Sequence, residues 1–438
     1  MTKTKLLHES FAVENGAFTI GGIPAEKLAE KYGTPLYVID TDAVRRMCRE
    51  YSSAISDFFG ENSHTAYAGK AFCCRGIYSI INEEGMYADC VSVGEIYTAL
   101  SAGFPRKKIF FHGSAKTDAE LEYAVREKIG FIVVDSEEEL DALDMIAGEL
   151  SSKQRVLLRI TPGIDAHTHK KIATGGADSK FGSSIATGAA ERITRLALSR
   201  RSIALVGFHA HIGSQIFDSA PFLEEARIML SFIADMRGKL GYEAAVLDLG
   251  GGFGVRYTES DPVLDIRETI RETADEVHTL CARLGLRVPD IFMEPGRSIV
   301  ASAGATLYTA QSVKSIEAGG AVKHYAAVDG GMTDDPRYAL YQSAYTVLNA
   351  SRPESAPDFI CSIAGRCCES GDILAEGVKI ARPKRGDVIA FLVTGAYNYS
   401  MASNYNRVPR PPVIAVSGGK DSIMVRRETP EDLLKLDT

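Results

Sequence analysis

The sequence lacks any apolar run long enough to cross a membrane. Its first eighteen residues also hold no apolar segment of the length that a signal peptide requires. Basic residues do not predominate, since 49 lysines and arginines stand against 57 acidic residues, for a formal charge of −8. This balance creates no positive field for nucleic acid or for an anionic membrane surface. We therefore expect a cytoplasmic protein that acts on a small molecule, without a nucleic-acid or membrane partner.

Cysteine occurs in no pattern typical of disulfides or of a metal site. The eight cysteines include the adjacent pairs Cys73–Cys74 and Cys367–Cys368, which cannot easily bridge to each other and match no metal-ligand spacing. Reduced thiols are expected.

Four histidines suggest a zinc site, but residues two apart on a strand supply no convincing third ligand, and we expect no metal. These histidines are His167, His169, His209 and His211.

Eight short apolar runs organise the first three hundred residues, and each ends in a polar or glycine-rich signature. Near-continuous apolar runs are typical of parallel strands buried on both faces, and amphipathic segments between them make βα units. Eight units predict an α/β fold, a (β/α)8 TIM barrel, whose active site lies at the carboxyl ends of the strands. The expected strands span residues 65–70, 88–92, 109–113, 131–136, 156–160, 206–213, 246–251 and 292–296. They end at Lys70, Asp89, His112, Asp135, Arg159, His211, Gly250 and Glu294.

After about residue 300 the pattern changes to alternating runs rich in β-branched residues, separated by glycine-rich turns. This change predicts a second, all-β domain of barrel or sandwich type. A strand pattern at residues 35–40 precedes the first barrel unit and is expected to join that domain. We therefore divide the chain into an N-terminal segment (1–42), the barrel (43–303) and a C-terminal β domain (304–438). The expected β-domain strands are 307–316, 325–328, 359–363, 388–393 and 413–416.

Helical patterns fill the connections between the barrel strands. Two of them span residues 118–128 and 136–150. The second opens with Ser136 and Glu139, the spacing of a capping box, which indicates a helix start at that point.

Lys70 follows the first barrel strand, where its amine would project into the mouth of the barrel. A partly desolvated lysine has its pKa lowered toward the nucleophilic form, as a Schiff base requires. An ordinary surface lysine is the alternative interpretation.

Two loops could hold a phosphate group. Glycines at 250–252 and 254 would let backbone N–H groups approach an anion, and the run lacks the spacing of a dinucleotide site. Barrels often bind phosphate after strands seven and eight, and the eighth strand is followed by Arg297. A purely structural role for either loop is the alternative.

Five further residues have side chains suited to a ring-bearing cofactor or to a substrate. Glu294 can face a ring nitrogen, because a carboxylate beside a protonated pyridine stabilises the charge that makes the ring an electron sink. His211 could stack on such a ring. Cys368 could transfer a proton, although a packed small hydrophobe is the default for cysteine. Arg337 could clamp a carboxylate together with Tyr341, one helical turn away, and a plain surface pair is the alternative.

Taken together, these motifs resemble the fold-type III PLP-dependent decarboxylases, the class-II ornithine, lysine and arginine decarboxylases, and most closely the diaminopimelate decarboxylase family. The resemblance covers nearly the whole chain and keeps the order of the family's motifs. The matching segments are residues 67–71 (YAGKA), 161–169 (TPGIDAHTH), 178–182 (DSKFG), 211–215 (HIGSQ), 250–252 (GGG), 294–297 (EPGR), 367–372 (CCESGD) and 394–397 (TGAY).

The resemblance implies that the barrel binds pyridoxal 5′-phosphate. Lys70 would form the Schiff base with the cofactor, and His211 would stack on its ring. Asp89 would lie near that linkage, and Glu294 would hold the pyridinium proton. The phosphate would be surrounded by Ser214, Gly250, Gly251, Gly252, Gly296 and Arg297, with Tyr397 close to the cofactor.

The resemblance also implies decarboxylation of meso-2,6-diaminopimelate to L-lysine and carbon dioxide, the last step of lysine biosynthesis. Glu369 would bind the distal ammonium, and Cys368 would be the general acid. In such enzymes this cysteine comes from the partner subunit, which implies a homodimer with shared active sites. The loop around residues 175–176 is similar to the family's mobile lid. The substrate's distal carboxylate would be met by Arg297, Arg337 and Tyr341, with Tyr397 also at the substrate.

One departure and three alternatives accompany this interpretation. Phe72 stands where many family members carry asparagine, which bears on specificity or loop packing more than on catalysis. A paralogous decarboxylase could act on carboxynorspermidine or another basic amino acid. A non-catalytic PLP-binding barrel would lack the β domain with its Cys368 and Glu369. An alanine-racemase-like enzyme would use a tyrosine as its second acid/base and would not carry the triple glycine with Glu-Pro-Gly-Arg.

Overall fold

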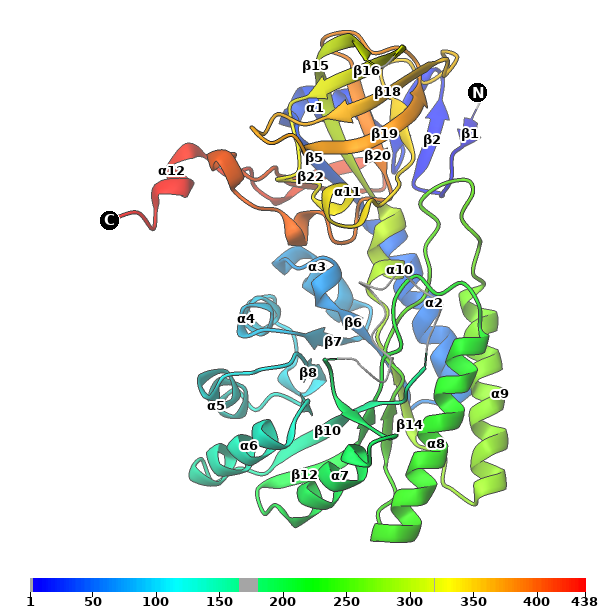
Figure 1. The fold of residues 1–438 in the computed structure, drawn as a ribbon, viewed down its shortest axis with the longest axis vertical. Coiled ribbons are helices and arrows are strands. Elements are labelled where there is room, and N and C mark those ends of the chain that lie inside the picture. Colours follow the sequence, from blue (N-terminus) through cyan, green and yellow to red (C-terminus); the bar gives the residue numbers. More distant parts are fainter. Residues whose placement is uncertain (1–2, 165–179, 319) are drawn as a thin grey trace. The chain divides into compact units, whose positions relative to one another are not determined.

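The computed structural model describes residues 3–164, 180–318 and 320–438 (Figure 1). Two histidines of the zinc interpretation, His167 and His169, lie outside the described residues, as do the expected lid at 175–176 and parts of the motifs at 161–169 and 178–182. The chain folds into two compact units. The barrel unit comprises residues 47–254 and 263–296, and the β unit comprises residues 1–46, 255–262 and 297–438.

The barrel unit is built on eight strands that all pair in parallel, and the last pairs with the first to close the barrel. This arrangement confirms the predicted TIM barrel. The strands are β6 (His64–Ala68), β7 (Tyr87–Cys90), β8 (Ile109–Phe111), β9 (Phe131–Val134), β10 (Gln154–Thr161), β12 (Ile203–His209), β13 (Val246–Asp248) and β14 (Asp290–Met293). A short β11 (Ser183–Ser184) extends the end of β10.

Helices connect these strands and lie along the outside of the barrel in Figure 1. The predicted helices at 118–128 and 136–150 are confirmed as α5 (Asp118–Arg126) and α6 (Glu137–Glu149). Ser136 caps α6 by accepting the Glu139 N–H, whereas the Glu139 carboxylate binds Lys116 Nζ at 2.7 Å, so only half of the capping box forms. The other helices are α2 (Thr41–Phe59), which begins in the β unit, α3 (Arg75–Glu83), α4 (Val93–Ser101), α7 (Ala189–Ser199), α8 (Ala220–Leu240) and α9 (Ile266–Leu284).

An aromatic layer fills the middle of the barrel. Phe110 stacks on Phe131 with 4.3 Å between ring centroids, and Phe292 packs edge-on against Phe110 at 5.0 Å. Side chains two residues apart on a strand point to the same face. The inward positions therefore continue from Phe110 to His112 and from Phe292 to Glu294, and this register places polar side chains above an apolar floor.

The β unit is organised around the long strand β15 (Gly304–Ala318), which pairs antiparallel with β16 (Ala321–Val328), β20 (Val388–Leu392) and β5 (Leu36–Asp40). The early strand β5 also pairs with β21 (Val413–Ser417), which confirms that the N-terminal strand joins the all-β domain. The remaining strands are β1 (Lys3–Lys5), β2 (Phe11–Glu14), β3 (Ala17–Ile20), β4 (Ile23–Pro24), β17 (Val347–Asn349), β18 (Phe359–Ala364), β19 (Ile373–Ile380) and β22 (Lys420–Val425). Its helices are α1 (Ala25–Tyr32), α10 (Arg297–Val300), α11 (Arg337–Tyr341) and α12 (Pro430–Leu434).

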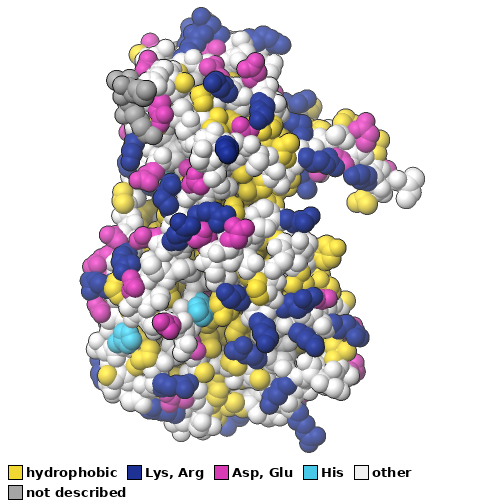
Figure 2. All heavy atoms as spheres, turned by 180° about the vertical axis from the view of Figure 1, so that it is seen from behind, with side chains coloured by type: hydrophobic (Ala, Val, Ile, Leu, Met, Phe, Trp, Pro, Cys, Tyr) yellow, Lys and Arg dark blue, Asp and Glu magenta, His cyan; other side chains and the backbone are white. Residues whose placement is uncertain are grey.

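The surface carries both signs of charge. On the face that Figure 2 shows, basic and acidic side chains are interspersed, with hydrophobic side chains between them. Across the described parts of the chain, no helix combines the length and the apolar character needed to span a membrane.

Candidate active site

A cavity of about 210 Å³ opens at the carboxyl ends of the barrel strands. Four of the predicted cofactor-binding residues line it, namely Lys70, Asp89, His211 and Glu294. The structure therefore brings together side chains that are up to 224 residues apart in the chain. The full lining is Lys70, Asp89, Val91, His112, Gly113, Arg159, Phe181, His209, His211 and Glu294.

Lys70 occupies a single turn of 3₁₀ helix, residues 69–71, directly after β6. The turn is held by two hydrogen bonds, from the Tyr67 hydroxyl to the carbonyl of Phe72 at 2.8 Å and from the Ala68 N–H to the carbonyl of Pro295 at 3.2 Å. Phe72 is almost fully buried. The departure from the family pattern at this position thus concerns packing beside the lysine.

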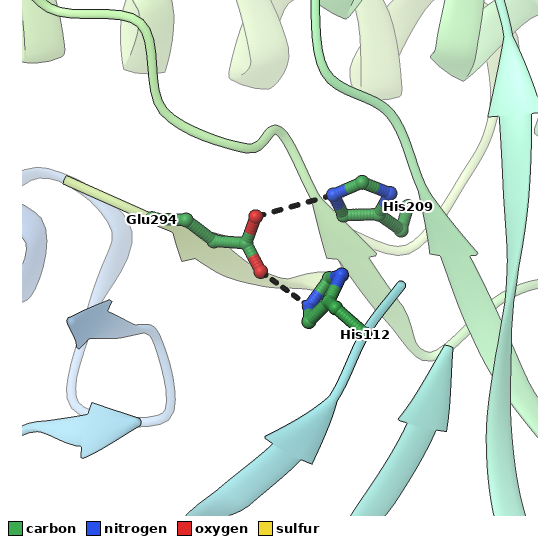
Figure 3. Close-up of side chains that lie close together, drawn as sticks. All are labelled: His112, His209 and Glu294. Atoms are coloured by element: carbon green, nitrogen blue, oxygen red, sulfur yellow. Dashed lines mark hydrogen bonds and ion pairs between the residues drawn. The ribbon is translucent and has the colours of Figure 1, made fainter. Parts of the chain in front are cut away.

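Glu294 follows β14 and is buried between two imidazoles (Figure 3). Its Oε1 lies 2.6 Å from His112 Nε2, and its Oε2 lies 3.2 Å from His209 Nε2. Burial alone would raise the pKa of Glu294, but the imidazoles of His112 and His209 outweigh it and hold this pKa well below its ordinary value. Burial lowers the pKa of His209 to about 4, so this imidazole is neutral at neutral pH. The cavity thus contains a buried carboxylate that remains ionised.

The pKa values of the neighbouring carboxyl groups shift in the opposite direction, upward. Burial raises the pKa of Asp89, and its Oδ1 lies 3.8 Å from His112 Nε2. Asp248, at the end of β13, is fully buried, and burial followed by the charge of Glu294 raises its pKa well above the ordinary value. Asp248 also accepts the Gly250 N–H at 2.8 Å. Sequence reasoning assigned no role to Asp248, because a carboxylate inside a strand carries no distinctive spacing.

Arg159 supplies a half-buried positive charge to the same cavity. It lies within β10, and its guanidinium lies 4.4 Å from the centroid of the Phe181 ring. Burial lowers the pKa of this guanidinium, while Asp135 and Glu294 oppose that shift. The sequence marked Arg159 only as a strand end.

His211 is a neutral ring at the wall of the cavity. Burial, followed by the charge of Lys70, lowers the pKa of His211 well below its ordinary value. Its Nδ1 accepts the Gly251 N–H at 3.2 Å. A neutral imidazole whose Nδ1 accepts carries its proton on Nε2, so this contact selects the tautomer. A neutral, oriented ring is suited to packing against another flat ring.

The triple glycine is required by close backbone approach. A Cβ at Gly251 would lie 2.3 Å from the Glu294 carbonyl oxygen, and one at Gly250 would lie 2.6 Å from that of Ala210. Gly252 has a φ of 113°, a conformation that favours glycine. Ser214 lies in the loop after β12, adjacent to this glycine turn, because the Ile216 N–H donates to the Gly252 carbonyl at 2.9 Å.

The second glycine-bearing loop approaches the lysine turn equally closely. A Cβ at Gly296 would lie 2.8 Å from the Cβ of Ala68. The predicted phosphate-binding glycines, 250–252 and 296, are thus all found in tightly packed loops at the carboxyl end of the barrel.

The other predicted residues gather in the β unit. The Arg297 guanidinium lies 4.6 Å from the centroid of the Tyr397 ring and donates to the Tyr257 hydroxyl at 2.8 Å. Arg337 lies 5.4 Å from the same Tyr397 ring and 5.2 Å from the Tyr341 ring. Arg297 and Arg337 are both nearly buried. Since Arg337 is buried and Tyr341 is partly covered, Arg337 and Tyr341 are not the plain surface pair that their spacing allowed. Tyr257 was missed because a single tyrosine in a loop carries no sequence signal.

Cys368 and Glu369 lie in the exposed loop between β18 and β19. The thiol of Cys368 is exposed in the single chain, which contradicts the alternative of a packed small hydrophobe. Asp372 shapes this loop, since its carboxylate accepts the N–H groups of Cys367 and Met332, each at 2.6 Å. Asp372 is itself almost fully buried.

Three donors at the base of the cavity could in principle hold a metal ion. The ligand atoms of His112, His209 and Glu294 lie within 4.8 Å of one another. Two donors on one tetrahedral zinc, each at about 2.0–2.1 Å from the ion, lie roughly 3.3 Å apart. The 2.6 Å between His112 and Glu294 is shorter than that, so these two side chains contact each other directly.

The chemistry of the cavity fits pyridoxal phosphate. A lysine amine, a neutral imidazole and an ionised buried carboxylate line one small cavity, and they suit an aldehyde, a flat ring and a protonated ring nitrogen respectively. Adjacent loops contain glycines whose backbone approaches closely, as a phosphate group requires. The cavity and its adjacent loops therefore contain residues whose charges suit each part of the cofactor.

Comparison with known proteins agrees with this chemistry. The family model described as "pyridoxal-dependent decarboxylase, pyridoxal binding domain" matches residues 41–301. Diaminopimelate decarboxylase of Bacillus methanolicus is 45% identical over 415 residues, which cover 95% of each chain. The corresponding protein of Bacillus subtilis is 46% identical over 424 residues, which cover 97% of this chain and 96% of the other.

A solved structure extends the agreement to the fold. Diaminopimelate decarboxylase from M. jannaschii, in complex with L-lysine, superimposes with a TM-score of 0.90 at 33% identity and covers 99% of both chains. The predicted resemblance is confirmed over the barrel and the β domain alike. This chain belongs to the diaminopimelate decarboxylase family of pyridoxal-dependent decarboxylases.

Proposed function

We propose that this chain removes one carboxyl group from meso-2,6-diaminopimelate and releases L-lysine and carbon dioxide, the last step of lysine biosynthesis. The observation that carries the proposal is the near full-length identity of 45% and 46% to proteins named diaminopimelate decarboxylase. The cavity supports it, because Lys70 and Glu294 line the same small space.

Pyridoxal phosphate is the cofactor, and when bound it supplies an electron sink for the pair left behind when the carboxylate departs as carbon dioxide. In our proposal Lys70 would hold the cofactor covalently through its side-chain amine. Glu294 holds the proton on the ring nitrogen, which its low pKa supports. His211 packs on the ring as a neutral imidazole, and Asp89 lies near the lysine linkage.

The phosphate would be held by Ser214, by the glycines at 250–252, and by Gly296 and Arg297. Backbone N–H groups in such glycine turns can approach phosphate oxygens because no Cβ intervenes. Tyr397 would lie close to the cofactor, and its ring packs on the Arg297 guanidinium.

Substrate choice would rest on the distal end of the substrate. Arg297, Arg337 and Tyr341 would bind the distal carboxylate, and Glu369 the distal ammonium, with Tyr397 also in contact. Ornithine and arginine have no distal carboxylate, so they would leave a buried guanidinium without its partner. That loss disfavours both amino acids. Cys368 would then protonate the α-carbon after carbon dioxide has left.

We further infer a homodimer in which the partner subunit supplies Cys368, and a cytoplasmic location. The exposure of the Cys368 thiol in the single chain supports the first inference, since a general acid must be excluded from bulk water during turnover. All eight cysteines are free, as is typical of a reducing compartment.

The substrate is tested by carbon dioxide release. Protein loaded with pyridoxal phosphate is offered meso-diaminopimelate, and L-ornithine, L-arginine and carboxynorspermidine are offered in parallel. Release from diaminopimelate alone, with formation of L-lysine, is expected. Release from another substrate alone would refute the proposed specificity and the roles of Arg337 and Glu369, while keeping the cofactor.

The shared site is tested by mixing two inactive variants, Lys70→Ala and Cys368→Ala. If each site combines a lysine from one subunit with a cysteine from the other, half of the dimers are mixed and each mixed dimer has one intact site. Activity should then recover to about a quarter of that of the parent enzyme, as two-fold symmetry requires. If both residues act within one subunit, every site stays defective and no activity returns.

A further inference from the structure

Two histidines in the cavity have no part in the proposed reaction, yet both face the same carboxylate. His112 follows β8 and His209 ends β12, and in Figure 3 their rings approach the two oxygens of Glu294 from the same side of the barrel. The distances are 2.6 Å from His112 Nε2 to Oε1 and 3.2 Å from His209 Nε2 to Oε2. Glu294 is thus held from both of its oxygens by different strands.

The packing below and beside the rings leaves them little freedom. The two imidazoles meet edge to face, with 4.8 Å between centroids and 71° between planes. His112 also lies against Phe110 of the aromatic layer, at 6.2 Å between centroids. Both histidines are almost fully buried. The rings are therefore fixed before any ligand enters.

Four buried carboxyl groups interact electrostatically in this region, and the pKa of one of them shifts in the direction opposite to the other three. Burial raises the pKa of Asp89, Glu225 and Asp248, and the charge of Glu294 contributes to each shift. The pKa of Glu294 is lowered instead. Glu294 differs from the other three in its direct contacts with two imidazoles, whereas Asp89 lies only within 3.8 Å of His112.

A neutral imidazole can favour a carboxylate without cancelling its charge. His209 is neutral because burial lowers its pKa to about 4. Its single proton must lie on Nε2 to donate to Glu294, since Nδ1 is buried with no hydrogen-bond partner among the described residues. The carboxylate therefore keeps its negative charge for a third group. The other charged groups that face this cluster are Lys70 and Arg159.

We propose that His112 and His209 are positioning residues that keep Glu294 ionised and aimed at the ring nitrogen of bound pyridoxal phosphate. They thereby determine how fully that nitrogen is protonated. The inference rests on the proposed placement of Glu294 beside the ring nitrogen. In this proposal His112 and His209 contribute to the reaction through Glu294, although neither touches the reacting atoms or the cofactor phosphate.

The test compares asparagine with glutamine at each histidine, as a matched pair of polar variants. Glutamine places an amide nitrogen near the position of Nε2, within reach of Glu294. Asparagine places its amide nitrogen near the position of Nδ1, and this shorter side chain does not reach Glu294. The ring nitrogen of the cofactor is labelled with ¹⁵N, and its NMR shift in the holoenzyme reports its protonation. The midpoint of thermal unfolding checks that each variant is folded.

We expect His209→Asn and His112→Asn to move the ¹⁵N shift toward that of the unprotonated ring. Turnover should fall about 10- to 100-fold, the loss expected when a carboxylate loses the hydrogen bond from His209 or the close ion-pair contact with His112, with KM for substrate little changed. The glutamine variants should restore both the shift and much of kcat. An Asn variant whose ring nitrogen stays as fully protonated as in the parent would overturn the proposal.

The Glu294→Gln variant distinguishes a failure of the proposed role of Glu294 from a failure of the inference about His112 and His209. If this variant leaves the ¹⁵N shift unchanged, Glu294 does not hold the ring nitrogen, and its proposed role fails. If it moves the shift while the histidine variants do not, only the inference about His112 and His209 fails.

A measurement on the unmodified holoenzyme keeps the proposal testable even if an asparagine variant does not fold. Histidine labelled with ¹⁵N should show His209 as the Nε2–H tautomer between pH 6 and 8. Protonation of His209 on Nδ1 alone would contradict the proposal, because that tautomer cannot donate to Glu294.

Discussion

Asp335 lies fully buried in the turn before α11, two residues ahead of Arg337. Neither of its carboxylate oxygens has a well-aligned hydrogen bond within the described residues. Burial, and then the neighbouring charge of Asp334, raises the pKa of Asp335 from 3.8 to about 7, although Arg337 partly offsets this. The carboxylate is therefore costly to keep in the folded protein at high pH. Replacing Asp335 by asparagine, which cannot ionise, should stabilise the protein.

The size and sign of this stabilisation follow from the pKa of Asp335 in the unfolded state, 3.8, and in the folded state, about 7. The folded state binds the proton more tightly than the unfolded state, so stability declines as pH rises from about 4 to 7 and the full cost is present above pH 7. At 1.36 kcal/mol per pKa unit, that cost is about 4 kcal/mol at pH 8 and less than half of that at pH 5. Asp335→Asn should remove it. If the 438 residues unfold together, the melting temperature should rise by roughly 4 °C at pH 8 and by less than half of that at pH 5.

Scanning calorimetry of the holoenzyme at pH 5 and pH 8 measures the effect. Asp358→Asn is the matched control, because Asp358 is exposed in the same unit and water solvates either side chain there. The reasoning is refuted if Asp335→Asn melts at or below the parent's temperature at pH 8, or if its advantage does not shrink at pH 5.

Three further predictions concern the site. Lys70→Ala should abolish the absorbance of the Schiff base between lysine and cofactor, whereas Cys368→Ala should keep that absorbance and lose turnover; Schiff-base absorbance that survives in the lysine variant would contradict the assignment. Gly251→Ala should lower the free energy of unfolding by about 3 kcal/mol and weaken pyridoxal phosphate binding, because its Cβ would lie 2.3 Å from a backbone carbonyl oxygen. Denaturant titration and equilibrium dialysis check this, and an unchanged midpoint would contradict it. Tyr257→Phe removes the hydroxyl that accepts from Arg297, so steady-state kinetics should show KM for substrate raised about tenfold, while an unchanged KM would exclude a positioning role for Tyr257.

The local pattern of apolar residues was sufficient to predict the barrel. A buried parallel strand needs a continuous apolar run, and its partner helix needs a periodic one, so both are visible in the order of residues. The closing residues Lys70, Asp89, His211 and Glu294 follow from the same pattern, because a barrel directs the carboxyl ends of its strands to one opening. The strand ends were less well predicted. For example, β12 ends at His209 and β13 at Asp248, where backbone turns replace ladder pairing although the apolar pattern continues.

The resemblance to a known family assigned roles to individual side chains, and three-dimensional packing then decided their chemistry. Glu294 could be named from its motif, but no local pattern predicts that its pKa falls while the pKa values of Asp89 and Asp248 rise. That outcome depends on His112 and His209, which lie 182 and 85 residues away in the chain.

Sequence alone therefore determined the succession of strands, the α/β class and the residues at the mouth of the barrel, since each depends on neighbours within a few positions. The tertiary structure decided which buried groups carry charge, that β5 lies between β15 and β21, and that Tyr257 binds Arg297. Charge in a buried site depends on desolvation and on contacts at about 3 Å, and both exist only once distant segments are packed together.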